Sequence, residues 1–229
     1  MGFLQLLGRA VLTAVVLALV LFALHVHPQT PLPDAWNVAR PLDPRAAPTP
    51  VTNWKLRRAT AAPSACRAAL SRGGATFQDE APREADGPCG ISDRVTLTGL
   101  SKATLDPLET RCGIALRLLM WEIHGVQPVA PVARVHHIGS YNCRTIRGSR
   151  RLSQHATGNA VDIVGFTLVG GQRLSLLRDW DPEHSPDARI LRRIQGASCD
   201  WFNLVLSPDY NELHRDHFHF DMGRYRSCR

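Results

Sequence analysis

Apolar residues in the middle of the chain recur with the spacing of an α-helix. Asp106 is a natural N-cap, Pro107 suits the first helical position, and Glu109 completes the pattern of a capping box. Gly125 is a plausible stop. We therefore predict a helix from Asp106 to Gly125 that packs against the core through one stripe of side chains: Leu108, Cys112, Ala115, Leu116, Leu119, Met120 and Ile123.

The flanking regions show shorter patterns. Ser64 is expected to cap a short helix that ends by Gly73-Gly74, and from residue 132 onward alternating apolar and polar positions indicate mainly strands. Helices first and strands mainly later favour an α+β fold, with an antiparallel sheet flanked by helices. The remaining expected elements are strands over 75–78, 95–97, 133–146, 203–206 and 218–222, a hairpin of 160–168 with 173–177, and a helix over 185–194.

A run of apolar residues without charge occupies the N-terminus. It extends from Ala10 to Leu24, and the stretch Phe3 to Leu7 lengthens it upstream of Arg9. About 17 to 25 apolar residues can span a bilayer. No good cleavage site follows, so residues 1–27 are expected to form a retained membrane anchor, with a cleaved signal as the alternative. In both cases the rest of the chain is exported.

Residues 28–63 contain eight prolines and few large apolar side chains. Such a composition favours an extended linker, since it offers little surface to bury. The folded domain is therefore predicted to cover residues 64–229, a length that can bury a sizeable core.

The distribution of charge and the number and spacing of the cysteines limit the functions that this protein can have. Residues 1–63 hold six Lys and Arg against two Asp, so residues 64–229 keep a surplus of only three of the +7 net charge. Nucleic-acid binding is not expected, because such proteins concentrate basic charge on the folded domain. Six cysteines follow the apolar run, with no Cys-x-x-Cys pair, which favours up to three disulfides of open pairing in an oxidising compartment: Cys66, Cys89, Cys112, Cys143, Cys199 and Cys228.

The first stretch that suggests chemistry combines His155, Gly158, Ala160 and Asp162. In a strand that starts near residue 159, Ala160 and Asp162 share one face, while the apolar side chains between and after them are buried on the other. Gly158 permits a turn that returns His155 to the face of Asp162. An imidazole and a carboxylate that converge in this way suit a zinc ion.

The second stretch lies near the C-terminus. His217, His219 and Asp221 alternate with Phe218 and Phe220, so the aromatic pair is expected to be buried and to fix the register of the strand. Three residues able to bind a metal or transfer a proton then line the opposite face. Each cluster alone has an ordinary structural explanation, but packing gives no reason for their joint occurrence, and we favour a metal site.

The sequence resembles the extensin-like C-terminal domain of bacterial envelope proteins. The resemblance covers about residues 64–229 and lies in Gly139-Ser-Tyr-Asn-Cys-Arg144, in Ser153-x-His155-x-x-Gly158-x-Ala160-x-Asp162, and in the segment from Cys199 to His219. More distantly, the two His-containing motifs are similar to those of zinc peptidases that cleave D-alanyl-D-alanine and related peptidoglycan peptides. The zinc-binding hedgehog signalling domain belongs to the same superfamily.

The resemblance implies a role for each matching residue. His155, Asp162 and His219 would bind Zn²⁺ and leave a fourth position for water. His217 would be the general base and later the acid, Arg144 would stabilise the oxyanion, and Ser153 would contact substrate. Many carboxypeptidase relatives place a Glu in the role of His217; its absence here favours the His-x-His pattern of endopeptidases. His214, Asp216 and Asp221 are candidates for orienting the metal-binding rings, although His214 and Asp216 suit solvated turns equally well.

Three functions remain open on this basis. The first is a zinc-dependent peptidase that acts on peptidoglycan peptides, tethered to the bacterial inner membrane with its domain in the periplasm. The second is a zinc- and disulfide-stabilised envelope domain that binds wall peptide or a protein partner without turnover. The third is a disulfide-bonded module without metal.

Overall fold

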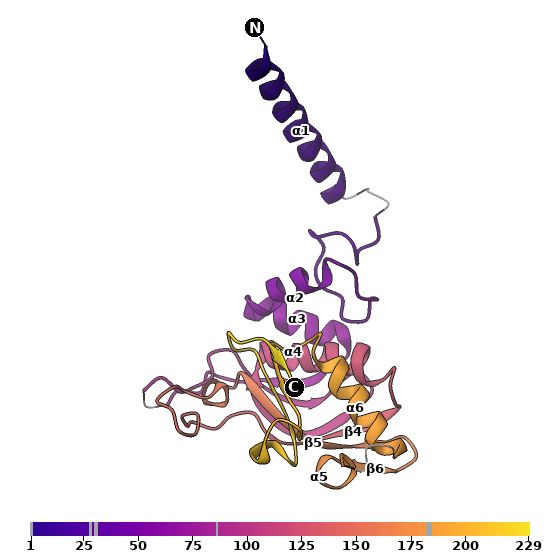
Figure 1. The fold of residues 1–229 in the computed structure, drawn as a ribbon, viewed down its shortest axis with the longest axis vertical. Coiled ribbons are helices and arrows are strands. Elements are labelled where there is room, and N and C mark those ends of the chain that lie inside the picture. Colours follow the sequence, from indigo (N-terminus) through magenta and orange to yellow (C-terminus); the bar gives the residue numbers. More distant parts are fainter. Residues whose placement is uncertain (1, 28, 30–31, 86, 182–184) are drawn as a thin grey trace.

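The computed structural model describes the chain apart from residues 1, 28, 30–31, 86 and 182–184. Across the described residues the protein is a mixed α+β structure with six α-helices and one sheet (Figure 1). The helices are α1 (Phe3–Val26), α2 (Thr52–Thr60), α3 (Pro63–Gly73), α4 (Cys112–Trp121), α5 (Leu176–Asp179) and α6 (Pro186–Ser198). The strands are β1 (Thr76–Asp79), β2 (Arg94–Gly99), β3 (Thr104–Arg111), β4 (Val132–Gly139), β5 (Ala160–Leu168), β6 (Arg173–Ser175), β7 (Leu204–Leu206), β8 (Phe218–Asp221) and β9 (Ser227–Cys228).

The strands form one sheet in the order β1-β2-β3-β4-β5-β8-β7-β9, with β6 paired to β5. Most neighbours are antiparallel, as expected, but β3 pairs with β4 and β7 pairs with β9 in parallel. β5 is central. It pairs with β4 along one edge, and along its other edge it pairs first with β8 and then with β6. The sheet thereby places the two His-containing segments on neighbouring strands.

Aromatic side chains fill the space between the sheet and its helices. The ring of Trp121 at the end of α4 contacts Phe166 of β5 and Phe220 of β8, with ring centroids 6.0 and 5.4 Å apart. Phe218 of β8 packs edge-on against Trp180, which follows α5. All of these rings are buried, so one face of β5 and β8 belongs to the core.

The prediction of a helix that starts at Asp106 is wrong for its first part. Residues 104–111 form β3, in which Leu105, Leu108 and Thr110 are buried, and α4 begins only at Cys112. Pro107, which has no N–H to donate, falls within the register shift between β2 and β3 and is exposed. Strand pairing therefore overrides the local capping pattern.

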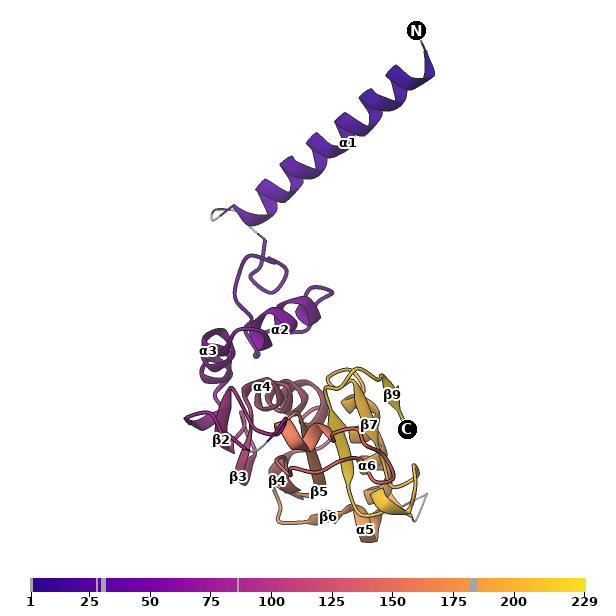
Figure 2. The same cartoon turned by 90° about the vertical axis from the view of Figure 1, so that its left-hand side faces the viewer.

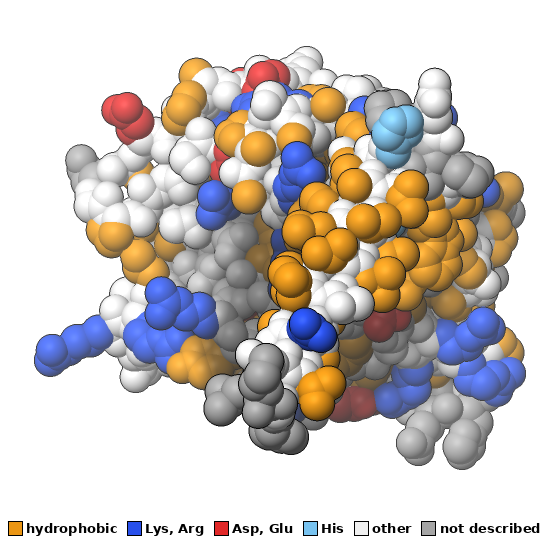
Figure 3. Space-filling model, turned by 90° about the horizontal axis from the view of Figure 1, so that it is seen from above, with side chains coloured by type: hydrophobic (Ala, Val, Ile, Leu, Met, Phe, Trp, Pro, Cys, Tyr) orange, Lys and Arg blue, Asp and Glu red, His pale blue; other side chains and the backbone are white. Residues whose placement is uncertain are grey.

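α1 is long and apolar enough to cross a membrane, as a membrane anchor or a signal sequence is, and its large apolar side chains from Leu6 to Leu24 are exposed (Figure 3). The segment after it differs from the extended linker expected over 28–63. Residues 52–60 form α2, in which Leu56 is fully buried, and α2 packs on α3 and α4 (Figure 2). The folded body therefore begins before residue 64.

Three disulfides pair all six cysteines: Cys66 with Cys112, Cys89 with Cys143, and Cys199 with Cys228. They close loops of 46, 54 and 29 residues. Each cross-link of this length stabilises a fold by roughly 4 kcal/mol in the chain-entropy description. The pairing fits a domain that folds outside the cytoplasm.

Candidate metal centre

The register of two neighbouring strands brings Asp162 and His219 together. They are direct partners in the antiparallel pair of β5 and β8, just as Ala160 is the partner of Asp221. Because side chains alternate along a strand, the residues between them, Val161 and Phe220, point into the core. Ala160 is fully buried, and the expected cleft above it stays a prediction.

His155 reaches the same face from a one-turn 3₁₀-helix, Gln154–Thr157, that precedes β5. The hydroxyl oxygen of Ser153 caps this turn by accepting a hydrogen bond from the backbone N–H of His155 at 3.3 Å. Gly158 ends it with a φ of 61°, and a Cβ there would lie 2.9 Å from the side chain of Ile91. Glycine is therefore required both for the turn and for the close approach.

Three potential ligand atoms converge at this point. His155 Nε2 lies 3.1 Å from His219 Nδ1 and 3.2 Å from Asp162 Oδ2, and His219 Nδ1 lies 2.9 Å from Asp162 Oδ1. Ligands about 2.0–2.1 Å from a tetrahedral zinc ion are about 3.4 Å from one another. The observed separations are close to that value, and two imidazoles with one carboxylate are a common set of ligands for catalytic zinc.

Hydrogen bonds on the outer side of each imidazole fix its orientation. The carbonyl oxygen of Ser140 accepts from His155 Nδ1 at 2.8 Å, which leaves Nε2 directed at the cluster. Asp221 Oδ2 accepts from His219 Nε2 at 3.1 Å and directs Nδ1 inward. Such partners hold metal-binding rings in place and raise their basicity.

His217 lies beside the three potential ligands. Its Nδ1 donates to the Asp216 carboxylate at 2.8 Å, and its Nε2 lies 3.7 Å from Asp162 Oδ1. The ring is therefore held by a carboxylate on one side while its other nitrogen is directed at the cluster. This is the arrangement that a general base requires.

His214 and Arg144 complete the surroundings. The His214 ring packs 5.2 Å from that of His217, and its Nδ1 bonds the Asn211 side chain at 2.8 Å. Burial, followed by the charges of His217 and His219, lowers the pKa of His214 to about 4, with Arg144 among the further causes. His214 is therefore neutral at pH 7, and Arg144 lies close enough to act on it electrostatically.

Without metal, the cluster holds a charge pair. Burial disfavours the His219 imidazolium, but hydrogen bonds to Asp162 and Asp221 outweigh this and raise the pKa of His219 to about 9. Burial would raise the pKa of Asp162, but hydrogen bonds from His155 and His219 outweigh it and hold that pKa far below its usual range. A metal ion would therefore replace a proton on His219.

The structure brings together the candidate residues singled out in the sequence. His155, Asp162 and His219 form the cluster, Asp221 and Asp216 each orient a ring, and His214 and His217 lie alongside. Ser153 is buried and caps the turn that carries His155, so it has a structural role, and its contact with substrate stays a prediction. Arg144 is exposed.

Sequence reasoning missed one contributor to this site. Ser140 lies in the quoted stretch Gly139 to Arg144, but no function followed from its residue type, because it acts through its backbone carbonyl. Its hydroxyl is also used, donating to the carbonyl oxygen of Ala160 at 2.5 Å. The buried hydroxyl of Ser140 and the positive φ of Gly139, 117°, fix the conformation of the loop whose carbonyl contacts His155.

Comparison with known proteins gives one match. The family described as extensin-like protein C-terminus matches residues 64–229, the range that contains the cluster and all three disulfides. No significant match was found among curated proteins or among solved structures. The extent of the family match shows that the chain belongs to the extensin-like C-terminal family.

Proposed function

We propose that this protein is a zinc-dependent peptidase that acts on peptidoglycan peptides in the bacterial cell envelope. The observation that carries the proposal is the convergence of His155, Asp162 and His219 next to the pair formed by His217 and Asp216. A metal-binding group and an oriented base in contact are the two components that metal-assisted hydrolysis requires.

His155 Nε2, Asp162 and His219 Nδ1 would hold the ion. A bound Zn²⁺ supplies a Lewis acid that makes water more acidic and polarises a carbonyl. The side chains of Asp162 and His219 keep 14% and 12% of their surface exposed, whereas that of His155 keeps 4%. The cluster is therefore partly exposed at Asp162 and His219, and a peptide would approach it from that side.

His217 would take a proton from the attacking water at Nε2 and later pass it to the leaving amine. Asp216 accepts the hydrogen bond from Nδ1 and thereby keeps Nε2 available as the acceptor. The nearby Arg144 would stabilise negative charge on the substrate carbonyl oxygen, an effect worth about 3–4 kcal/mol for a well-placed donor.

Substrate class and location rest on further observations. The motifs around His155 and His219 are similar to those of peptidases that cleave D-alanyl-D-alanine and related wall peptides. The apolar α1 would anchor the chain in the inner membrane, and the three disulfides suit a domain in the periplasm. The mature domain would then face the wall polymer.

The test uses the full chain in a non-ionic detergent. We expect about one zinc per chain, and release of amino groups from muropeptides that mass spectrometry assigns to a particular bond. His217→Ala should lower turnover by about 10²–10⁴-fold, the usual contribution of a general base, while zinc content stays near one.

His136→Ala is the matched control, because His136 bonds Thr167 on the neighbouring strand and lies outside the cluster. Turnover that survives in His217→Ala, or zinc content near zero in the unchanged protein, would contradict the proposal.

A second function is favoured by one observation. The chain has His217 where many carboxypeptidase relatives have a Glu, so a domain that binds zinc and wall peptide without turnover is the alternative. It predicts retention of muropeptides on the immobilised protein, no cleavage at any pH, and full zinc content.

A further inference from the structure

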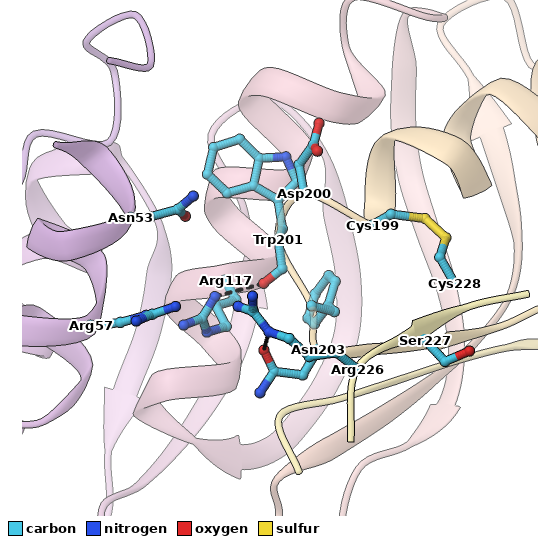
Figure 4. A pocket seen from close by; sticks show the side chains of 11 residues that line it. Asn53, Arg57, Arg117, Cys199, Asp200, Trp201, Asn203, Arg226, Ser227 and Cys228 are labelled. Atoms are coloured by element: carbon cyan, nitrogen blue, oxygen red, sulfur yellow. Dashed lines mark hydrogen bonds between the residues drawn. A yellow bond between two sulfur atoms is a disulfide. The ribbon is translucent and has the colours of Figure 1, made fainter. Parts of the chain in front are cut away.

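A cavity lies where α2 and α4 meet the C-terminal segment, and none of its lining residues belongs to the His cluster (Figure 4). Its volume is about 400 Å³, within the usual range for small-molecule sites. α2 contributes Asn53 and Arg57, α4 contributes Arg117, and the remainder of the lining comes from residues 199–203 and 226–228. The disulfide between Cys199 and Cys228 closes one side.

Three guanidinium groups face this cavity. Figure 4 shows the side chains of Arg57, Arg117 and Arg226 directed at the same region from three elements. Arg117 is 92% buried by residue surface, with 8% exposed, and its Nη1 donates to the carbonyl oxygen of Trp201 at 2.7 Å. The side chain of Arg226 donates to the Asn203 side chain at 3.3 Å.

Within the described part of the chain, no negatively charged side chain pairs with these three guanidinium groups. No described carboxylate lies within ion-pair distance of Arg57, Arg117 or Arg226. Asp200 lines the cavity, but its carboxylate points away from the three guanidiniums (Figure 4). Burial, followed by the charges of Arg57 and Arg226, lowers the pKa of Arg117 to about 10, so the group is still charged at pH 7.

A buried cation without an anionic partner is costly, and so is the mutual repulsion of three cations. Arginine presents a planar fork of N–H donors that suits the oxygens of a phosphate group. A phosphate in the cavity would neutralise the charge and use donors that protein groups leave available. We propose that this cavity is a binding site for a phosphate group.

The place of the cavity in the fold suggests where the phosphate comes from. α2 lies next to the end of α1, since Val51 and Trp54 line one shallow space together with Phe22 and His25. His25 Nε2 also accepts a hydrogen bond from the backbone N–H of Val38 at 3.1 Å. Where α1 spans the membrane, the cavity lies on the membrane side of the body. Phospholipid headgroups and soluble phosphate compounds are then the two sources, and both share the same recognition chemistry.

The test is calorimetric titration of the full chain in a non-ionic detergent with inorganic phosphate and, separately, with short-chain phosphatidylglycerol. We expect saturable binding of phosphate that weakens as salt is raised. Arg57→Gln with Arg226→Gln should weaken it at least about tenfold, because two charge-assisted hydrogen bonds are lost. Both side chains are exposed, so folding should be preserved; Arg57→Gln alone is the milder variant.

The matched control is Arg58→Gln with Arg224→Gln, which removes two neighbouring exposed charges outside the cavity and should change the affinity less than about twofold. Phosphatidylglycerol that binds at least about tenfold tighter than phosphate identifies the headgroup as the ligand; equal or weaker binding identifies a soluble phosphate compound. Absence of saturable phosphate and lipid binding, or equal losses in both pairs of variants, would overturn the proposal.

Discussion

The two faces of the strand pair β5 and β8 have opposite environments, although their residues alternate along the same two short strands. Val161 and Phe220 point to the helices and are fully buried, whereas Asp162 and His219, one position along, form a polar cluster that is partly exposed. The first face is a packed aromatic core, and the second holds the titratable groups that would hold a metal under the proposed function. The two are separated only by the alternation of side chains along a strand.

This difference shows how the core positions the chemistry. A slip of β8 by one residue along β5 would bury His219 and expose Phe218 and Phe220, so aromatic packing opposes the slip. The packing energy that fixes the positions of Asp162 and His219 therefore comes from the opposite, apolar face of the two strands. Substitutions on each face should separate the two contributions.

The largest effect is expected from His219→Ala on the polar face. Zinc affinity should fall by well over about 100-fold, because a ligand is lost as well as its orienting partner, and activity should vanish. Zinc titration against a competing chelator measures the change. Near-native zinc affinity would mean that His219 is not a ligand; His136→Ala should keep the affinity of the unchanged protein.

On the core face, Phe220→Ala should lower the free energy of unfolding by about 3–5 kcal/mol, because it leaves a cavity beside Trp121 and Phe202. Urea unfolding of the metal-free protein measures this. Ile138→Ala, an exposed apolar position on β4, should cost less than about 0.5 kcal/mol. Equal effects of the two variants would contradict the role given to the core.

Sequence patterns were most informative where alternation and chemistry coincide. Asp162 and His219 stand in strands whose apolar neighbours set their direction, and a two-residue period suffices to predict which side chains share a face. The meeting of the two segments followed from resemblance alone, since no local pattern states which strands pair. That ligand set was implied by the distant similarity to zinc peptidases, whereas the extensin-like family match covers both segments.

Prediction was poorest where long-range packing decides the structure. At Asp106 and Pro107 a capping pattern predicted a helix, yet β2 supplies a partner and Glu109 binds Arg83 and Arg94 across the sheet. Likewise, composition predicted a linker where Leu56 in fact docks on the body. The arginine cavity had no local signal, because its three guanidiniums come from residues 57, 117 and 226.

A moderate effect on the polar face is expected from Asp221→Asn. The amide can still contact His219 Nε2, but it no longer favours the basic ring, so zinc affinity should fall by about 10–100-fold. Stability of the metal-free protein should change in the same direction, because the pair with the His219 imidazolium is weakened. An unchanged zinc affinity, measured with the same chelator, would show that Asp221 does not orient the ring.

The effect that is smallest per step, about tenfold in zinc affinity for each pH unit, is the pH dependence of zinc binding. His219 has a pKa of about 9 in the metal-free protein, so below that pH zinc must displace one proton, and affinity should rise about tenfold per pH unit from pH 6.5 to 8.5. The stability of the metal-free protein should instead fall as the pH rises. The raised pKa contributes stability that is fully present below about pH 6.5, the unfolded value, and is lost as the pH rises through 9. Phe220→Ala, which changes only the core face, should lower stability at every pH without changing the slope of zinc affinity. A slope of zero in the unchanged protein would mean that the proton on His219 does not compete with the metal.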